Sequence, residues 1–118
     1  MILPQEGALH PHPGSGVHRL PPHLPHPVDY PIFPDDENRR FAVYYLELEP
    51  GSYWQSEPHL RGTTEFITVF GGTVEIVAAE QSFSLSRGES IRFKGDAVHS
   101  YRNPGEETAV LHMILYNP

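Results

Sequence analysis

The sequence contains no cysteine and few basic residues. Without cysteine, disulfide bonds, thiolate zinc sites and cysteine nucleophiles are excluded. Eight Lys and Arg residues stand against fifteen Asp and Glu residues, which gives a formal net charge of −7 at pH 7. A nucleic-acid surface needs clustered cations, so we expect no direct nucleic-acid binding.

Long apolar runs are also missing. No run approaches the roughly 20 residues that span a bilayer. The N-terminus does not show the basic-then-apolar order of a secretory signal, because Pro4 and Glu6 interrupt it. We therefore expect a cytoplasmic protein without membrane contact. The length of 118 residues suits one compact domain.

Proline and histidine are distributed unevenly along the chain. Residues 1–34 contain nine of the thirteen prolines and five of the eight histidines. Because proline lacks a backbone N–H and fixes φ, this stretch can neither continue a helix nor enter a central strand. The composition predicts an irregular Pro/His-rich arm over residues 1–34 and a folded domain over residues 35–118.

The remainder of the chain shows short strand-like segments between turns, with no helical period over three turns. The expected strands are 41–48, 64–70, 73–79, 81–86, 90–93, 97–103 and 108–116. Gly71 and Gly72 suit a two-residue hairpin, since glycine adopts positive φ readily. Segment 108–116 is apolar on both faces, which indicates a central strand. This pattern predicts an all-β fold, an antiparallel sandwich or barrel.

Potential metal ligands occur on three of these segments. Glu57 and His59 are two residues apart and share a face if their segment is extended. Glu65 opens an otherwise apolar run, where a buried carboxylate is costly unless it is paired or bound to a metal. Together with His99 they form a candidate site for iron, manganese, nickel or zinc, and two histidines with one carboxylate suit non-haem iron.

Each of these residues also has a purely structural interpretation. Glu65 can lie at a barrel rim, hydrogen-bonded to the preceding turn. His99 can be a buried histidine bonded to Tyr101 or to a backbone carbonyl. His59 can simply be exposed, and His112, surrounded by apolar residues, is more typical of a core histidine than of a ligand.

Two stretches resemble the conserved motifs of the cupin superfamily. The first motif matches at Gly51, Glu57, His59, Glu65 and Gly72. The second matches at Gly88, His99 and Asn103. The resemblance covers residues 41–118. It implies an antiparallel cupin barrel, also called a double-stranded β-helix or jelly roll, with metal ligands at the positions of His59, Glu65 and His99.

The chain departs from these motifs at several positions. Glu57 stands where the first motif has a histidine, and the spacing from His59 to Glu65 is longer by one or two residues. Lys94 and Asp96 replace a proline and a glycine of the second motif, which affects a turn rather than a ligand. A carboxylate still binds hard or borderline metals, so Glu57 remains a candidate ligand.

The resemblance extends to the C-terminal cupin domain of XRE-type helix-turn-helix transcriptional regulators, through ELEPGSYWQSEPHLRGTTEFITVFGGTVEI and GESIRFKGDAVHSYRNPGEETAVLHMILY. It implies a sensory barrel that binds a small effector, and many such barrels lack a complete metal site. Residues 1–34 are too rich in proline to form the DNA-binding bundle. We therefore expect a sensor-like, small-molecule-binding homodimer without a DNA-binding domain of its own, which catalyses no reaction.

Two alternatives remain open at this point. One is a metal-dependent cupin enzyme of the dioxygenase, isomerase or epoxidase type, in which an open metal position activates oxygen or polarises a carbonyl. The other is a dimerising barrel with a vestigial site. The sequence offers no general base or nucleophile apart from the metal-ligand candidates, and this favours the binding function over the enzyme.

Overall fold

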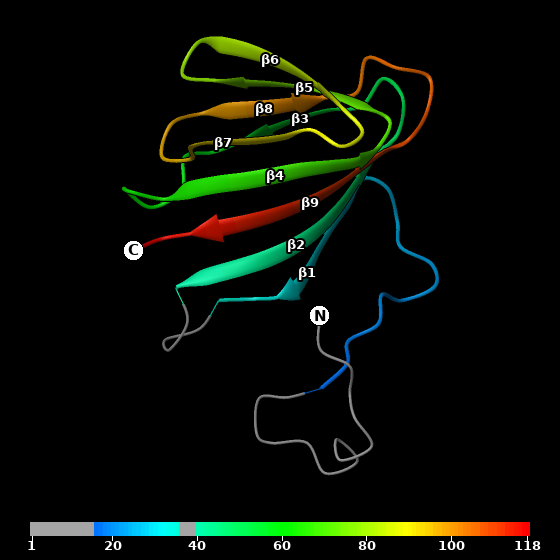
Figure 1. Ribbon diagram of the computed structural model, residues 1–118, viewed down its shortest axis with the longest axis horizontal. Helices are drawn as coiled ribbons and strands as arrows, with labels where there is room; N and C mark the ends of the chain where they lie inside the picture. Colours follow the sequence, from blue (N-terminus) through cyan, green and yellow to red (C-terminus); the bar gives the residue numbers. More distant parts are fainter. Residues whose placement is uncertain (1–15, 36–39) are drawn as a thin grey trace.

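The computed structural model describes residues 16–35 and 40–118, which form two antiparallel sheets and contain no helix (Figure 1). No helix in these residues is long and apolar enough to cross a membrane. The nine strands are β1 (Val28–Phe33), β2 (Phe41–Leu48), β3 (Tyr53–Ser56), β4 (Thr64–Gly71), β5 (Thr73–Ala78), β6 (Gln81–Ser86), β7 (Ser90–Lys94), β8 (His99–Arg102) and β9 (Ala109–Tyr116). The expected all-β class is confirmed.

The two sheets stack face to face. One has the order β1-β2-β9-β4-β7 and the other the order β3-β8-β5-β6; Figure 1 shows the four-stranded sheet above the five-stranded one. Strand β9 occupies the middle of its sheet, as its apolar composition predicts. The inward residues of both sheets form the core, in which Leu46, Leu48, Ile67, Val69, Val74, Ile76 and Leu111 are almost completely buried.

The hairpin expected at Gly71-Gly72 is wrong. Strands β4 and β5 belong to different sheets, so the two glycines carry the chain from one sheet to the other. Gly72 has φ of +70°, and a Cβ there would lie 2.7 Å from the carbonyl oxygen of Thr108. Glycine is required because the backbone must pass close to β9 in a left-handed conformation.

A two-residue hairpin does join β5 and β6. Ala78 pairs with Gln81, which leaves Ala79 and Glu80 as the connection. Both residues have positive φ, 49° and 65°. This is the backbone of a type I′ turn, which matches the twist of the flanking strands but is unfavourable for residues that carry a Cβ.

Strand β1 begins inside the segment that was expected to be irregular. It pairs with β2 at the edge of the five-stranded sheet, with a register shift between Pro31 and Phe33. An edge strand with a bulge is the position in a sheet that tolerates proline. The domain boundary at residue 35 stays a prediction, and residues 1–15 of the expected arm lie outside the described residues.

The strained turn generates a stability prediction. Glu80→Gly should raise the free energy of unfolding by about 0.5–1 kcal/mol, because glycine removes the steric penalty of the left-handed conformation. Urea denaturation measures the change. Glu49→Gly is the matched control, since Glu49 is an exposed turn residue without positive φ; there glycine should destabilise. Equal destabilisation by the two variants would contradict the strain argument.

Candidate metal centre and ligand cleft

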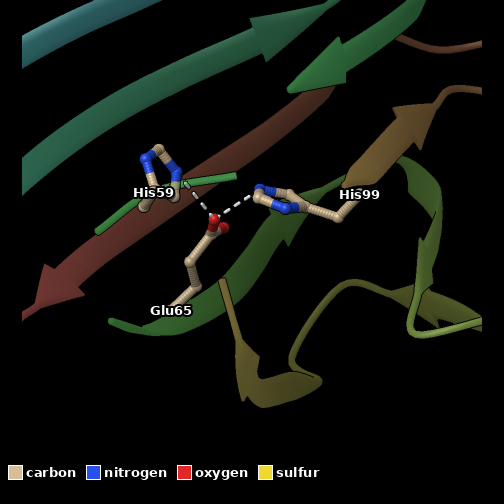
Figure 2. Close-up of side chains that lie close together, drawn as sticks. All are labelled: His59, Glu65 and His99. Carbon is tan, nitrogen blue, oxygen red and sulfur yellow. Dashed lines mark ion pairs between the residues drawn. The ribbon is translucent and has the colours of Figure 1, made fainter. Parts of the chain in front are cut away.

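Three of the four expected ligands converge inside the sandwich. The ligand atoms of His59, Glu65 and His99 all lie within 4.8 Å of one another. Glu65 points inward from β4, His99 starts β8, and His59 belongs to the loop between β3 and β4. Figure 2 shows the Glu65 carboxylate between the two imidazole rings. Its Oε2 lies 3.1 Å from His59 Nε2 and 2.5 Å from His99 Nε2.

Glu57 lies apart from this cluster. Its side chain is exposed and does not belong to the group of converging ligand atoms. Strand β3 ends at Ser56, so the segment from Glu57 to His59 does not continue the alternation on which the shared face depended. Glu57 as a ligand therefore stays a prediction, without support from this geometry.

The loop that carries His59 is fastened to the turn before β8. The backbone N–H of His59 donates to Gly95 O at 2.8 Å, and the N–H of Gly95 donates to Thr63 O at 2.8 Å. The Asp96 carboxylate accepts from the N–H of Gly62 at 2.9 Å. The longer spacing before Glu65 is thus accommodated by an anchored turn, and Asp96, a departure from the cupin motif, serves as an anchor.

Hydrogen bonding within the cluster leaves two buried atoms facing each other. His99 Nδ1 lies 2.8 Å from Ala97 O, and a carbonyl only accepts, so Nδ1 carries a proton. Nε2 is then directed at Glu65 Oε2. Among the described residues, these are the two buried side-chain atoms without a hydrogen-bond partner. A proton or a cation between them is needed to offset the burial of the carboxylate.

The protonation equilibria agree with this arrangement. Burial lowers the pKa of His99, but the adjacent Glu65 carboxylate and the Ala97 carbonyl outweigh burial, so the pKa is raised. The Tyr101 hydroxyl donates to Glu65 Oε1. Burial and the Glu65 carboxylate raise the pKa of Tyr101, so its phenol remains a donor. Tyr101 therefore fixes one carboxylate oxygen and leaves the other for the imidazoles.

Gly95 was not identified from the sequence as part of the site. A Cβ at this position would lie 3.0 Å from Glu65 Oε2 and 3.1 Å from His59 Cδ2. Any larger residue would require the side chains of Glu65 and His59 to shift by a few tenths of an ångström. Tyr101 was named from the sequence only as a possible hydrogen-bond partner of His99, and its spacing of two residues from His99, which places both on one strand face, was the available signal for its role. No local pattern pointed to Gly95, because its neighbours come from distant segments.

A cleft opens beside His59. It has a volume of about 260 Å³. The His59 side chain is 31% exposed, whereas those of Glu65 and His99 are fully buried. Access to the cluster therefore runs past His59. The walls combine apolar and polar residues, among them Asp35, Arg40, Tyr44, Leu60, Thr63, Leu115 and Asn117.

The donor set fits a divalent metal ion. Two imidazoles and one carboxylate suit iron, manganese, nickel or zinc, and three protein ligands leave positions for water or a small molecule. The unsatisfied Glu65 Oε2 and His99 Nε2 and the space kept by Gly95 are the features that a bound cation would explain. His59, Glu65 and His99 can therefore hold a metal ion.

The Tyr101 hydrogen bond generates a prediction for the metal-free protein. Tyr101→Phe should lower the free energy of unfolding by about 1–3 kcal/mol, because Glu65 Oε1 loses a buried donor. Chemical denaturation with added chelator measures this. Tyr53→Phe is the control, since that tyrosine is exposed and its hydroxyl donates to Gln55. Equal losses of unfolding free energy in both variants would show that the buried hydrogen bond stabilises the fold no more than the exposed one does.

Comparison with known proteins relates this geometry to a family. Residues 44–115 match the family described as Cupin domain (Cupin_2). The HTH-type transcriptional regulator SutR of Escherichia coli (strain K12) is 31% identical over 87 residues, which are 74% of this chain and 49% of SutR. The chain thus spans about half the length of that regulator.

Solved structures show the same relationship. The Cupin_2 domain of an XRE family transcriptional regulator from Enterobacter cloacae superposes with a TM-score of 0.73 and is 32% identical, covering 77% of this chain and 96% of that one. An HTH_3 family transcriptional regulator from Vibrio cholerae gives a TM-score of 0.71 and 30% identity, over 76% of this chain and 50% of the other. The expected fold and resemblance are confirmed: the chain belongs to the cupin family and is similar to the cupin domains of XRE-type regulators.

Proposed function

We propose that this chain is a sensor-like cupin module that binds a small molecule in the cleft beside His59. A divalent metal ion held by His59, Glu65 and His99 would form the inner end of that cleft. The observation that carries the proposal is the position of His59, which belongs to the ligand cluster and also lines the cleft. A molecule in the cleft can therefore reach the cluster.

The cleft favours a small ligand with an anionic group. Its volume of about 260 Å³ lies slightly below the range of about 300–1,000 Å³ that is typical of sites for drug-sized molecules. Arg40 lines the cleft, and its main chain is fixed because its carbonyl accepts from the N–H of Asn117 at 2.8 Å. Burial, together with Asp29 and Asp35, raises the pKa of Tyr44, which keeps its phenol protonated. Arg40 supplies a cation, Asp35 an opposing carboxylate and Tyr44 a neutral polar group, and we propose that Arg40 receives the anionic group of the ligand.

Several residues of the chain would support a bound metal ion, each in a different way. When bound, the ion would supply a Lewis acid that polarises a ligand oxygen. Tyr101 holds Glu65 in place, Ala97 fixes the tautomer of His99, and Gly95 keeps the space free. Second-shell hydrogen bonds of this kind orient metal ligands and contribute to metal affinity. No step beyond binding is needed for a sensor.

The relatives support a regulatory role. SutR and the Enterobacter cloacae protein are both named as transcriptional regulators. This chain matches about half of SutR, so the activity of the whole regulator is not carried over. With a net charge of −7, the chain itself is a poor nucleic-acid binder. We propose a response to a small effector without direct DNA contact.

A metal-dependent enzyme is the second candidate. Two histidines and one carboxylate with open positions form the ligand set of non-haem iron oxygenases, and this is the observation that favours it. An enzyme should turn over a cleft-bound molecule only when the metal is present. A sensor should be stabilised by the molecule and leave it chemically unchanged. Thermal stability and product analysis on the same sample separate the two functions.

Metal binding generates the next prediction. The full chain, purified without an added histidine tag, should contain about one equivalent of a divalent metal by elemental mass spectrometry, as a three-ligand site implies. Gly95→Ala should lower metal affinity at least about tenfold, because the new Cβ displaces Glu65 and His59. Gly71→Ala is the control, since its Cβ would meet nothing closer than 3.7 Å. Equal metal content in both variants would contradict the proposed site.

The ligand is tested separately from the metal. Small mono- and dicarboxylates should raise the melting temperature of the metal-loaded protein. At a hundredfold excess over Kd, binding adds about 2.7 kcal/mol to the free energy of unfolding. Arg40→Gln should abolish most of this shift and leave the metal content unchanged. Arg87→Gln, on an exposed turn, is the control. A shift that survives Arg40→Gln would reject the anionic ligand and keep the metal site.

A further inference from the structure

The cleft beside His59 is lined by residues of both charges. Asp35 follows the end of β1, Arg40 precedes the start of β2, and both line the cleft. Among the described residues, the ion pairs join other side chains, so Asp35 and Arg40 do not pair with each other. A molecule in the cleft therefore meets a cationic residue and an acidic residue together.

Asp29 on β1 places a second carboxylate near the cleft. It pairs with Leu46, which is buried on the inward face of β2, so the Asp29 side chain is on the inward face as well. Tyr44 lines the cleft and shares that face, two residues from Leu46 along β2. Burial is the largest cause of the raised pKa of Tyr44 and of Tyr101, and the Asp29 charge contributes to both. This influence on two phenols agrees with an inward direction of Asp29.

The two carboxylates act on the same part of the cleft. Burial raises the pKa of Tyr44, and the charges of Asp29 and Asp35 raise it further. The space next to the Tyr44 phenol therefore has a negative potential. A plain anion bound to Arg40 would share the cleft with Asp35, and like-charge repulsion would oppose its binding.

We propose that the ligand of the cleft is a small zwitterion of the amino-acid type, with a carboxylate for Arg40 and an ammonium group for Asp35. This inference rests on the proposed function and deepens it, since it adds a cationic group to the anionic one. A zwitterion satisfies both charges of the cleft. A plain carboxylate faces Asp35 and a plain amine faces Arg40, so each meets repulsion, which is an effective source of specificity.

The hydrogen-bonding groups of the cleft match those of such a ligand. The planar guanidinium of Arg40 can bind a carboxylate through two parallel N–H···O bonds. An ammonium group has donors only, and the Asp35 carboxylate has acceptors only. The protonated phenol of Tyr44 can donate to the ligand carboxylate or accept from its ammonium group. Every polar group of the ligand thus has a partner of the correct type.

The size and the apolar walls of the cleft suit an aliphatic amino acid. A volume of about 260 Å³ corresponds to about nine water molecules at about 30 Å³ each, which is close to the number of non-hydrogen atoms in free L-leucine. Leu60 is 76% exposed and lines the cleft together with Ala42 and Leu115. An aliphatic ligand side chain that covers this apolar surface would remove it from water and gain affinity.

The test is isothermal titration calorimetry of the metal-loaded full chain with matched probes. L-leucine is compared with isocaproate, which lacks the ammonium group, and with isoamylamine, which lacks the carboxylate. L-aspartate and succinate form a second pair. Each amino acid should bind about tenfold more tightly than its matched carboxylate, because one charged hydrogen-bonded contact is added. Isoamylamine should bind more weakly than L-leucine.

Two variants separate a local contact from a general effect of charge. Asp35→Asn should lower the affinity for L-leucine about tenfold and leave that for isocaproate unchanged or higher, so that the preference for the zwitterion disappears. Glu106→Gln is the control, since Glu106 is an exposed acid between β8 and β9 and its substitution changes the net charge equally; there the preference should persist. Metal content is measured on every sample, so that loss of metal is not mistaken for loss of ligand affinity.

The outcomes distinguish this inference from the function on which it rests. Carboxylates that bind as tightly as the amino acids would overturn the zwitterion and leave the anionic ligand in place. A preference that survives Asp35→Asn, or one that is lost equally in Glu106→Gln, would also overturn it. Absence of binding by all five probes would overturn the proposed carboxylate ligand as well.

Discussion

The structure depends on how the burial of one carboxylate, that of Glu65, is compensated by its neighbours. Glu65 is completely buried between the two sheets, where an isolated charge is costly. Tyr101 donates to one oxygen, and the imidazoles of His59 and His99 approach the other. Every element around the site contributes to this arrangement, from the loop that holds His59 to the glycine that leaves room for it. A core that served stability alone would place an apolar residue at Glu65, and this is the physical reason to regard the cluster as functional.

Strand β4 separates a buried set of side chains from an exposed one. Its inward residues carry Glu65 into the core, whereas its outward residues place Phe66 and Phe70 on the surface. Because strand side chains alternate, Glu65 of the proposed metal centre and the exposed Phe66 are adjacent in sequence and lie on opposite faces of the sheet.

Much of the fold could be predicted from the sequence, because strand alternation is a local property. Seven expected segments correspond to strands, and the apolar segment that became β9 is central. The edge strand β1 was missed because Pro31 interrupts its pattern, although a bulged edge accommodates proline. In the site, the cupin motifs identified His59, Glu65 and His99, whose side chains converge. Glu57, predicted from its spacing to His59 and from its position in the first cupin motif, lies outside the cluster because β3 ends before it.

The sequence by itself determined the strand pattern, the family and the residue types able to bind a metal, since these depend on local periodicity and on short motifs. The tertiary structure decided which sheet each strand joins, so that Gly71 and Gly72 connect two sheets rather than two paired strands. It also decided that Gly95 adjoins Glu65 and that Phe66 stays partly exposed among the described residues. These properties depend on contacts between residues far apart in the sequence, which no local pattern contains.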